Sequence, residues 1–105
     1  MSNQLVLFAR ITPKPEHLEV ARQAILGILP VTRAVPGCRM FKLHDDLDGG
    51  RRLYLYEVWD NDAALAVHHA QPYTQAVFES YREWLSEPVE ITMLRELGGE
   101  AGCSS

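Results

Sequence analysis

Hydrophobic positions along the chain recur with two different periods, and this divides it into strands and helices. An apolar run from about Gln4 to Thr12 ends at Pro13, which cannot donate to a sheet hydrogen bond, so the run predicts a strand. From Pro15 onward the apolar residues return at helical spacing instead. The residues with this spacing are Leu18, Ala21, Ile25, Ile28 and Leu29. They predict a helix that Pro30 kinks or interrupts and that ends near Arg33.

A sharp boundary between this helix and the next strand is expected in the segment Thr32–Cys38. Pro36 disfavours the helical conformation at Val35, and Gly37 permits the backbone turn that lets an extended segment begin. The turn is therefore expected to be well ordered.

The middle of the chain predicts a β-hairpin. Its strands are expected at about Cys38–Asp45 and Arg51–Trp59, and they are joined through Asp48-Gly49-Gly50. A pair of glycines between two apolar runs favours a tight turn, so the two strands should be antiparallel neighbours.

The last third of the chain predicts two helical segments and a final strand. Asp60 or Asn61 can cap the first segment, which carries Ala63 to Ala70. Pro72 begins the second segment, where apolar residues again recur at helical spacing. The residues with this spacing are Val77, Phe78, Tyr81, Trp84 and Leu85. A final strand is expected between Pro88 and Leu97.

The resulting order, βαββαβ, predicts an α+β ferredoxin-like fold, an antiparallel sheet with its helices on one face. The first and third strands are central in that topology, and both are apolar on both faces. Their apolar residues include Leu5, Val6, Leu7, Phe8, Ala9, Leu53, Tyr54, Leu55, Tyr56 and Val58. Helices on one face cannot cover the other, so we expect a homodimer that packs sheet against sheet into a dimeric α+β barrel.

Composition and charge limit the possible partners. The chain has 105 residues, 47% of them hydrophobic, which suits one domain, expected at residues 1–97 with a disordered tail at 98–105. The net charge of −4 and the scattered Lys and Arg residues argue against a nucleic-acid partner. No apolar stretch is as long as a membrane span and no secretion signal is recognisable, so we expect a cytoplasmic protein with no membrane partner.

Four short motifs, in order, resemble a known family. They are Thr32–Cys38 with its Pro-Gly-Cys end, Leu55–Trp59, Ala64–His68 and Pro72-Tyr73. Between Leu5 and Leu97 the chain resembles the antibiotic biosynthesis monooxygenase family, in the subgroup of small quinol-monooxygenase-like proteins. This resemblance implies one cavity per subunit, between helices and sheet. It also implies oxygenation of an electron-rich aromatic or enol by O2 without a cofactor, with isomerisation and haem degradation as side branches.

The haem-degrading branch does not fit this chain. Members of that branch use an Asn, a Trp and an iron-ligating His at positions where this sequence has Ala9, His68 and Phe78. Phenylalanine has no atom that can ligate iron, so we expect no haem.

His68 is the expected catalytic residue, because it stands at the position of the family's histidine. A neutral imidazole can take a proton near pH 7, and the imidazolium can then hold the resulting anion. For a quinol, loss of the phenolic proton raises the electron density of the ring enough for it to pass an electron to O2. The alternative is a core or surface histidine, and of His68 and His69 only one is expected to point inward.

Four further residues are candidates for substrate binding. Glu57 and Trp59 lie two apart on a strand and share a face, where an indole wall beside a carboxylate could orient an aromatic ring. Alternatively, Trp59 belongs to the core and Glu57 forms a salt bridge with Arg10. Tyr73 could place its hydroxyl at the pocket mouth or pack in the core, and Phe78 could form a cavity wall.

No metal site is expected. His17, His44, Asp45 and Asp46 have no spacing that brings four ligands together, and Cys38 and Cys103 show neither a disulfide nor a metal pattern. The activity that the family resemblance implies is cofactor-independent monooxygenation of a small phenol, quinol or enol. Two alternatives remain open: an isomerase on the same scaffold, and a dimer that binds a small ligand without turnover.

Overall fold

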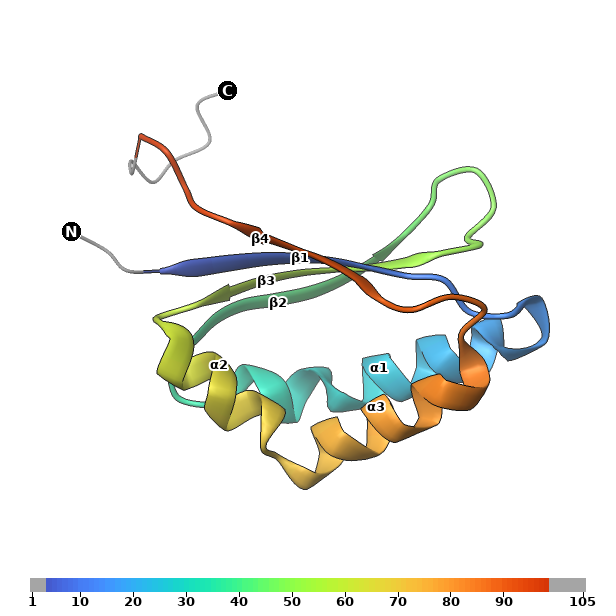
Figure 1. Cartoon of the computed structure of the whole chain (residues 1–105), viewed down its shortest axis with the longest axis horizontal. Helices are drawn as coiled ribbons and strands as arrows, with labels where there is room; N and C mark the ends of the chain where they lie inside the picture. Colours follow the sequence, from blue (N-terminus) through green and yellow to red (C-terminus); the bar gives the residue numbers. More distant parts are fainter. Residues whose placement is uncertain (1–3, 99–105) are drawn as a thin grey trace.

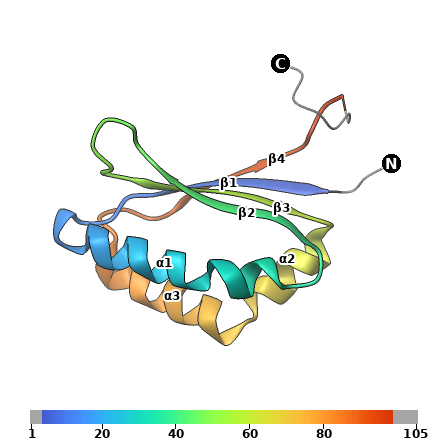
Figure 2. The same cartoon turned by 180° about the vertical axis from the view of Figure 1, so that it is seen from behind.

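The computed structural model describes residues 4–98 as an antiparallel sheet covered on one face by helices (Figures 1 and 2). In chain order the elements are β1 (Leu5–Ile11), the 3-10 helix η1 (Pro15–His17), α1 (Leu18–Arg33), β2 (Cys38–Asp45), β3 (Leu53–Trp59), α2 (Asp62–His69), α3 (Pro72–Trp84) and β4 (Glu90–Leu94). This is the α+β ferredoxin-like fold that the pattern predicted. The tail predicted to be disordered lies, apart from Gly98, outside the described residues.

The strands lie in the order β2-β3-β1-β4, so β1 and β3 are central, as predicted. Neighbouring strands are antiparallel throughout. The register pairs Leu7 with Glu57 and Ala9 with Leu55, and it brings Phe41 of β2 opposite Glu57 from the other side. Because side chains alternate along a strand, these residues all point toward the helices.

The predicted element boundaries hold to within a few residues, with some differences. The first helix begins as the short η1 turn, and β3 and β4 are shorter than expected. Of the two effects predicted for Pro30, an interruption is wrong, because α1 continues through Pro30 to Arg33, while a kink stays a prediction. Pro30 cannot donate to the carbonyl of Leu26, but both residues are exposed, so the unpaired carbonyl lies on the solvent side of the helix.

The turn between α1 and β2 fixes the start of α2. Gly37 has φ of 90°, a conformation that residues with a side chain rarely adopt, and its carbonyl accepts a hydrogen bond from the Asp60 backbone N–H at 2.8 Å. A Cβ at Gly37 would lie 2.5 Å from the Cβ of Ala64. Asn61 caps α2 by accepting from the Ala64 N–H at 2.9 Å. The first turn of α2 is thus held against the end of the sheet.

The two faces of the sheet have different environments. The helix-facing side chains form the core, which consists of Leu7, Ala9, Ile11, Ala21, Ile25, Phe41, Leu53, Leu55, Trp59, Ala64 and Leu65. On the other face no described helix covers the central strands (Figure 1). There Phe8 is 37% exposed and stacks on Tyr54, with ring centroids 5.8 Å apart. The two-faced apolar character predicted for β1 and β3 is therefore present.

Candidate active site

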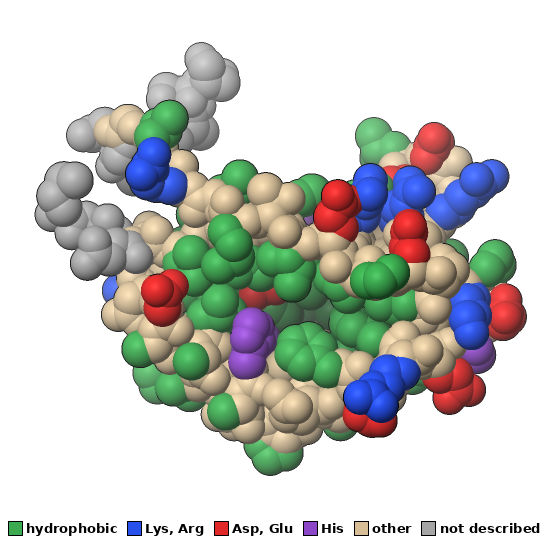
Figure 3. Space-filling view, in the orientation of Figure 1, with side chains coloured by type: hydrophobic (Ala, Val, Ile, Leu, Met, Phe, Trp, Pro, Cys, Tyr) green, Lys and Arg blue, Asp and Glu red, His purple; other side chains and the backbone are tan. Residues whose placement is uncertain are grey.

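A cavity lies between the sheet and the helices. Its empty space, with the open mouth included, is about 570 Å³. Figure 3 shows the opening as a hollow lined mainly by hydrophobic side chains, with a histidine at its edge and an acidic side chain inside. The lining residues are Leu7, Ala9, Ile11, Ile25, Ile28, Phe41, Leu55, Glu57, His68, His69, Thr74, Val77, Phe78, Tyr81, Val89 and Ile91.

Glu57 is a carboxyl buried in this apolar cavity. Its side chain comes from the centre of β3, it is 4% exposed, and its Oε1 accepts a hydrogen bond from Trp59 Nε1 at 2.9 Å. Burial raises the pKa of Glu57 to about 7, although the Trp59 hydrogen bond acts in the opposite direction. The alternative salt bridge with Arg10 is wrong, because Arg10 lies opposite Tyr54 on the other face and pairs with Glu90.

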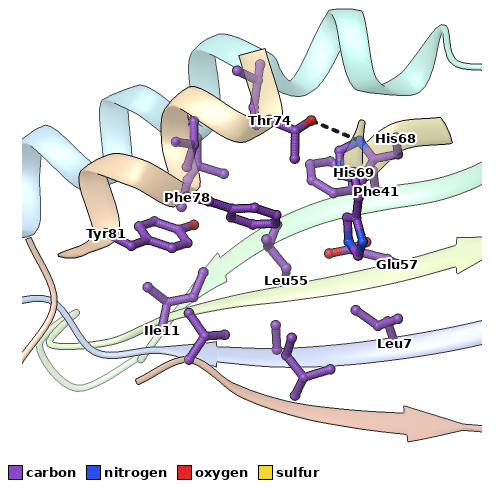
Figure 4. A pocket seen from close by; sticks show the side chains of 16 residues that line it. Leu7, Ile11, Phe41, Leu55, Glu57, His68, His69, Thr74, Phe78 and Tyr81 are labelled. Atoms are coloured by element: carbon purple, nitrogen blue, oxygen red, sulfur yellow. Dashed lines mark hydrogen bonds between the residues drawn. The ribbon is translucent and has the colours of Figure 1, made fainter. Parts of the chain in front are cut away.

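His68 is buried at the end of α2, with 4% exposure. Its ring stacks on Trp59 at 4.8 Å between centroids and meets the edge of Phe41 at 5.5 Å. Its Nδ1 lies 3.4 Å from Thr74 Oγ1, a long hydrogen bond (Figure 4). Burial, with a smaller contribution from the charge of His69, lowers the pKa of His68 to about 4. The imidazole is therefore neutral at pH 7.

Both histidines line the cavity, although only one was expected to point inward. His68 is deep, and His69 is half-buried and contacts the edge of Phe78 at 5.6 Å between centroids. The expectation assumed a continuing helix, whereas α2 ends at His69 and the chain turns into α3. Neighbouring residues at a helix end can both face a cavity that lies beside that end.

Trp59 and Tyr73 lie behind the cavity wall and do not line it. Trp59 is fully buried and supports both His68, by stacking, and Glu57, by its indole hydrogen bond. Tyr73 has its ring centroid 6.2 Å from that of His68, and its hydroxyl is buried without a hydrogen-bond partner among residues 4–98. Each side chain was predicted either to contact substrate or to pack in the core, and in the structure each packs against His68 of α2.

Residues of α3 form a further part of the cavity wall. Phe78 lines the cavity as predicted and is 42% exposed, which places it at the mouth. Thr74 and Tyr81 also line it, and neither was predicted to do so. The signal was available, since positions 74, 78 and 81 recur at helical spacing. Burial, followed by the charge of Glu57, raises the pKa of the Tyr81 hydroxyl.

The polar groups of the cavity lie mainly at one end. Figure 4 shows His68 and Glu57 at that end, the first from the helical layer and the second from the sheet, with Phe78 between them and Tyr81. Among residues 4–98, no three His, Cys, Asp or Glu side chains are placed to hold a metal ion. In the same part of the chain no helix is long and apolar enough to cross a membrane. Cys103 lies outside the described residues.

The structure is that of a small ferredoxin-like protein with a mainly apolar cavity between sheet and helices. The family model described as "Antibiotic biosynthesis monooxygenase" matches residues 5–80, and the chain belongs to this family. It is similar to "Putative monooxygenase Rv0793" of Mycobacterium tuberculosis, with 31% identity over 92% of this chain and 95% of the relative.

Solved structures agree with this assignment. That of Rv0793 superposes with a TM-score of 0.87 at 28% identity and covers 93% of this chain and 99% of the other. The crystal structure of PA3566 from Pseudomonas aeruginosa gives a TM-score of 0.86 at 31% identity over 93% and 98% of the two chains.

Proposed function

We propose that this protein is a monooxygenase that acts on a small hydrophobic phenol, quinol or enol with O2 and no cofactor, as in the quinol-monooxygenase-like subgroup. The observation that carries the proposal is a neutral imidazole, His68, at the polar end of an otherwise apolar cavity. Membership in the family and similarity to a mycobacterial protein named as a monooxygenase support the same class of reaction.

His68 acts as the base in this proposal. If Nδ1 carries the ring hydrogen and donates it to Thr74 Oγ1, Nε2 keeps a lone pair that can accept the hydroxyl proton of the substrate. The imidazolium then holds the substrate anion, whose electron-rich ring or double bond passes an electron to O2. Stacking on Trp59 fixes the ring plane, so the base does not have to be ordered during the reaction.

The remaining candidates bind or position the substrate. Phe78 at the mouth offers an aromatic face, and Glu57 offers a hydrogen-bond partner for a polar group of the ligand. Trp59 and Tyr73 act through His68 and Glu57, since neither lines the cavity. The apolar walls keep water away from the substrate anion, which strengthens its interaction with the imidazolium.

The assembly that we propose is a homodimer of single-domain subunits, residues 1–97, packed sheet against sheet. The exposed Phe8 and its stacked neighbour Tyr54 lie on the face that no described helix covers. Burial of this face is favourable, and it leaves the cavity on the opposite side of the sheet free for ligand.

The test is oxygen uptake by the purified protein with a panel of quinols, catechols and enols. We expect uptake with at least one of them, reduced about 100-fold or more in His68→Ala, because a general base contributes roughly 10²–10⁴-fold. His17→Ala, in η1 and outside the cavity lining, is the matched control and should retain full activity. Unchanged uptake in His68→Ala would contradict the assignment of the base.

An isomerase is the second candidate, and one observation favours it. A buried carboxyl and a buried imidazole lie at one end of the cavity, an arrangement that could move a proton within a hydroxyketone. Product formation without oxygen uptake would identify this reaction. Ligand binding that neither consumes oxygen nor yields a product would indicate a binding protein instead.

A further inference from the structure

The Glu57 carboxyl is buried without a cation. No Lys or Arg occurs among the described residues that line the cavity. Within residues 4–98, the carboxyl accepts a single hydrogen bond, which comes from Trp59. An ionised carboxylate in such a place is costly, and a simple packing role would be met by an apolar residue. Buried, weakly paired carboxyls in clefts are frequent at functional sites.

Four titratable side chains lie around Glu57. They are His68 and His69 from α2, Tyr81 from α3 and Cys38 from β2, while α1, β1 and β4 contribute only apolar residues to the lining. Burial lowers the pKa of both histidines and raises the pKa of Cys38 and Tyr81. All four side chains are therefore uncharged at pH 7.

We infer that Glu57 is a second catalytic residue, which exchanges a proton with the reacting dioxygen while His68 exchanges a proton with the substrate hydroxyl. This inference rests on the proposed function. The geometry supports it because the two side chains reach the same end of the cavity from opposite layers, Glu57 from β3 and His68 from α2 (Figure 4). A planar substrate held between the layers would meet a different group on each side.

The proton balance of the oxygenation requires two such groups. His68 takes the hydroxyl proton, the anion combines with O2 at a ring or enol carbon that bears a hydrogen, and a C–O bond forms to a peroxide anion. Glu57 gives its proton to the distal oxygen. The O–O bond then breaks as Glu57 takes the proton from that carbon and His68 returns its proton to the leaving hydroxide. The products are a carbonyl and water, the four electrons taken up by O2 come from the substrate, and both residues regain their initial states.

The ionisation of the two residues fits these roles. With a pKa of about 4, His68 is free to accept a proton at pH 7. With a pKa of about 7, Glu57 is near half protonated there and can donate one. Pairs of groups whose surroundings move their pKa values in opposite directions commonly divide acid and base roles in this way.

The experiment compares Glu57→Gln with wild type in two assays. The first is binding of 4-nitrophenol, whose anion is coloured; ionisation of the bound phenol should be kept in Glu57→Gln and lost in His68→Ala. The second is oxygen uptake with the most active quinol of the panel, where Glu57→Gln should lower kcat about 100-fold or more. Glu87→Gln, at an exposed position, is the matched control for both.

The pH dependence separates a catalytic from a structural role. Wild-type oxygen uptake should fall as pH rises through about 7, because Glu57 loses its proton there. Trp59→Phe removes a hydrogen bond that lowers the pKa of Glu57, so the fall should move to higher pH. If Glu57→Gln takes up oxygen at the wild-type rate and with the wild-type pH profile, this inference is wrong, but the proposed function still stands. Absence of uptake by wild type with every quinol, catechol and enol of the panel would overturn the proposed function, and this inference with it.

Discussion

Glu57 and His68 are buried in the same cavity, but burial moves their pKa values in opposite directions. The pKa of Glu57 rises from 4.5 to about 7, so its ionised form destabilises the folded state increasingly as pH rises through that window. The pKa of His68 falls from 6.5 to about 4, so the stability that its neutral form allows is lost as pH falls through that window. The two slopes oppose each other between about pH 4.5 and pH 6.5.

Glu57→Gln should therefore stabilise the protein in a pH-dependent way. Near pH 4 the wild-type carboxyl is neutral in the folded state and largely so in the unfolded state, and the variant should gain little. Near pH 8 the wild type carries a buried carboxylate, and the gain should approach about 3 kcal/mol, since a pKa unit corresponds to about 1.4 kcal/mol. Urea unfolding at both pH values measures the difference. An equal gain at the two pH values would show that Glu57 does not titrate in this range.

The sequence was sufficient to select the candidate residues, but it did not show what surrounds each of them in the fold. A spacing of two placed Glu57 and Trp59 on one face of a strand, which is correct, but it could not show that Glu57 lines the cavity while Trp59 lies behind it. That difference depends on where α2 and α3 meet the sheet. The same long-range packing brings both His68 and His69 into the lining, which local helix geometry alone did not predict.

At the scale of elements, the position of His68 depends on how α2 is joined to the sheet. The turn at Gly37 contacts Ala64 in the first turn of α2, and His68 follows one helical turn after Ala64. The segment Thr32–Cys38 was predicted to be a sharp, ordered turn from its Pro-Gly pair. The structure adds that the turn also packs against the helix that carries the proposed base.

Gly37→Ala should be strongly destabilising. The new Cβ would have an unfavourable φ of 90° and would lie 2.5 Å from Ala64 Cβ, so we expect a loss of about 2–4 kcal/mol from strain and overpacking. Gly27→Ala is the matched control, because Gly27 lies on the exposed surface of α1 and a Cβ added there would meet nothing within 4 Å. It should gain roughly 0.5–1 kcal/mol. Thermal unfolding of both variants checks this, and similar melting temperatures would contradict it.

At the scale of the whole molecule, the fold could be predicted from local pattern because local and global preferences agree. Helical spacing from Leu18, the hairpin glycines and the strand order all favour one topology, and the structure has it. The failures are local. Pro30 stays within α1 because its exposed position makes the missing hydrogen bond tolerable, and a sequence pattern does not report exposure at a single residue.

The face of the sheet away from the helices bears on how subunits assemble. Phe8 and Tyr54 stack there, next to Tyr56 and Met40, on a surface that no described helix covers. In a two-fold symmetric dimer each residue of this face is buried twice, once per subunit, so a single charge introduced there acts twice.

Wild type should therefore sediment as a dimer at micromolar concentration, and Phe8→Lys as a monomer. A buried lysine in each subunit should weaken association by roughly 3 kcal/mol or more, about 100-fold in Kd. Val20→Lys, at an exposed position of α1 in the helical layer, is the matched control and should remain a dimer. Because the Phe8 side chain points away from the cavity, Phe8→Lys should still bind 4-nitrophenol, which shows that the subunit is folded. A wild-type monomer, or a Phe8→Lys dimer of unchanged affinity, would contradict the sheet-to-sheet assembly.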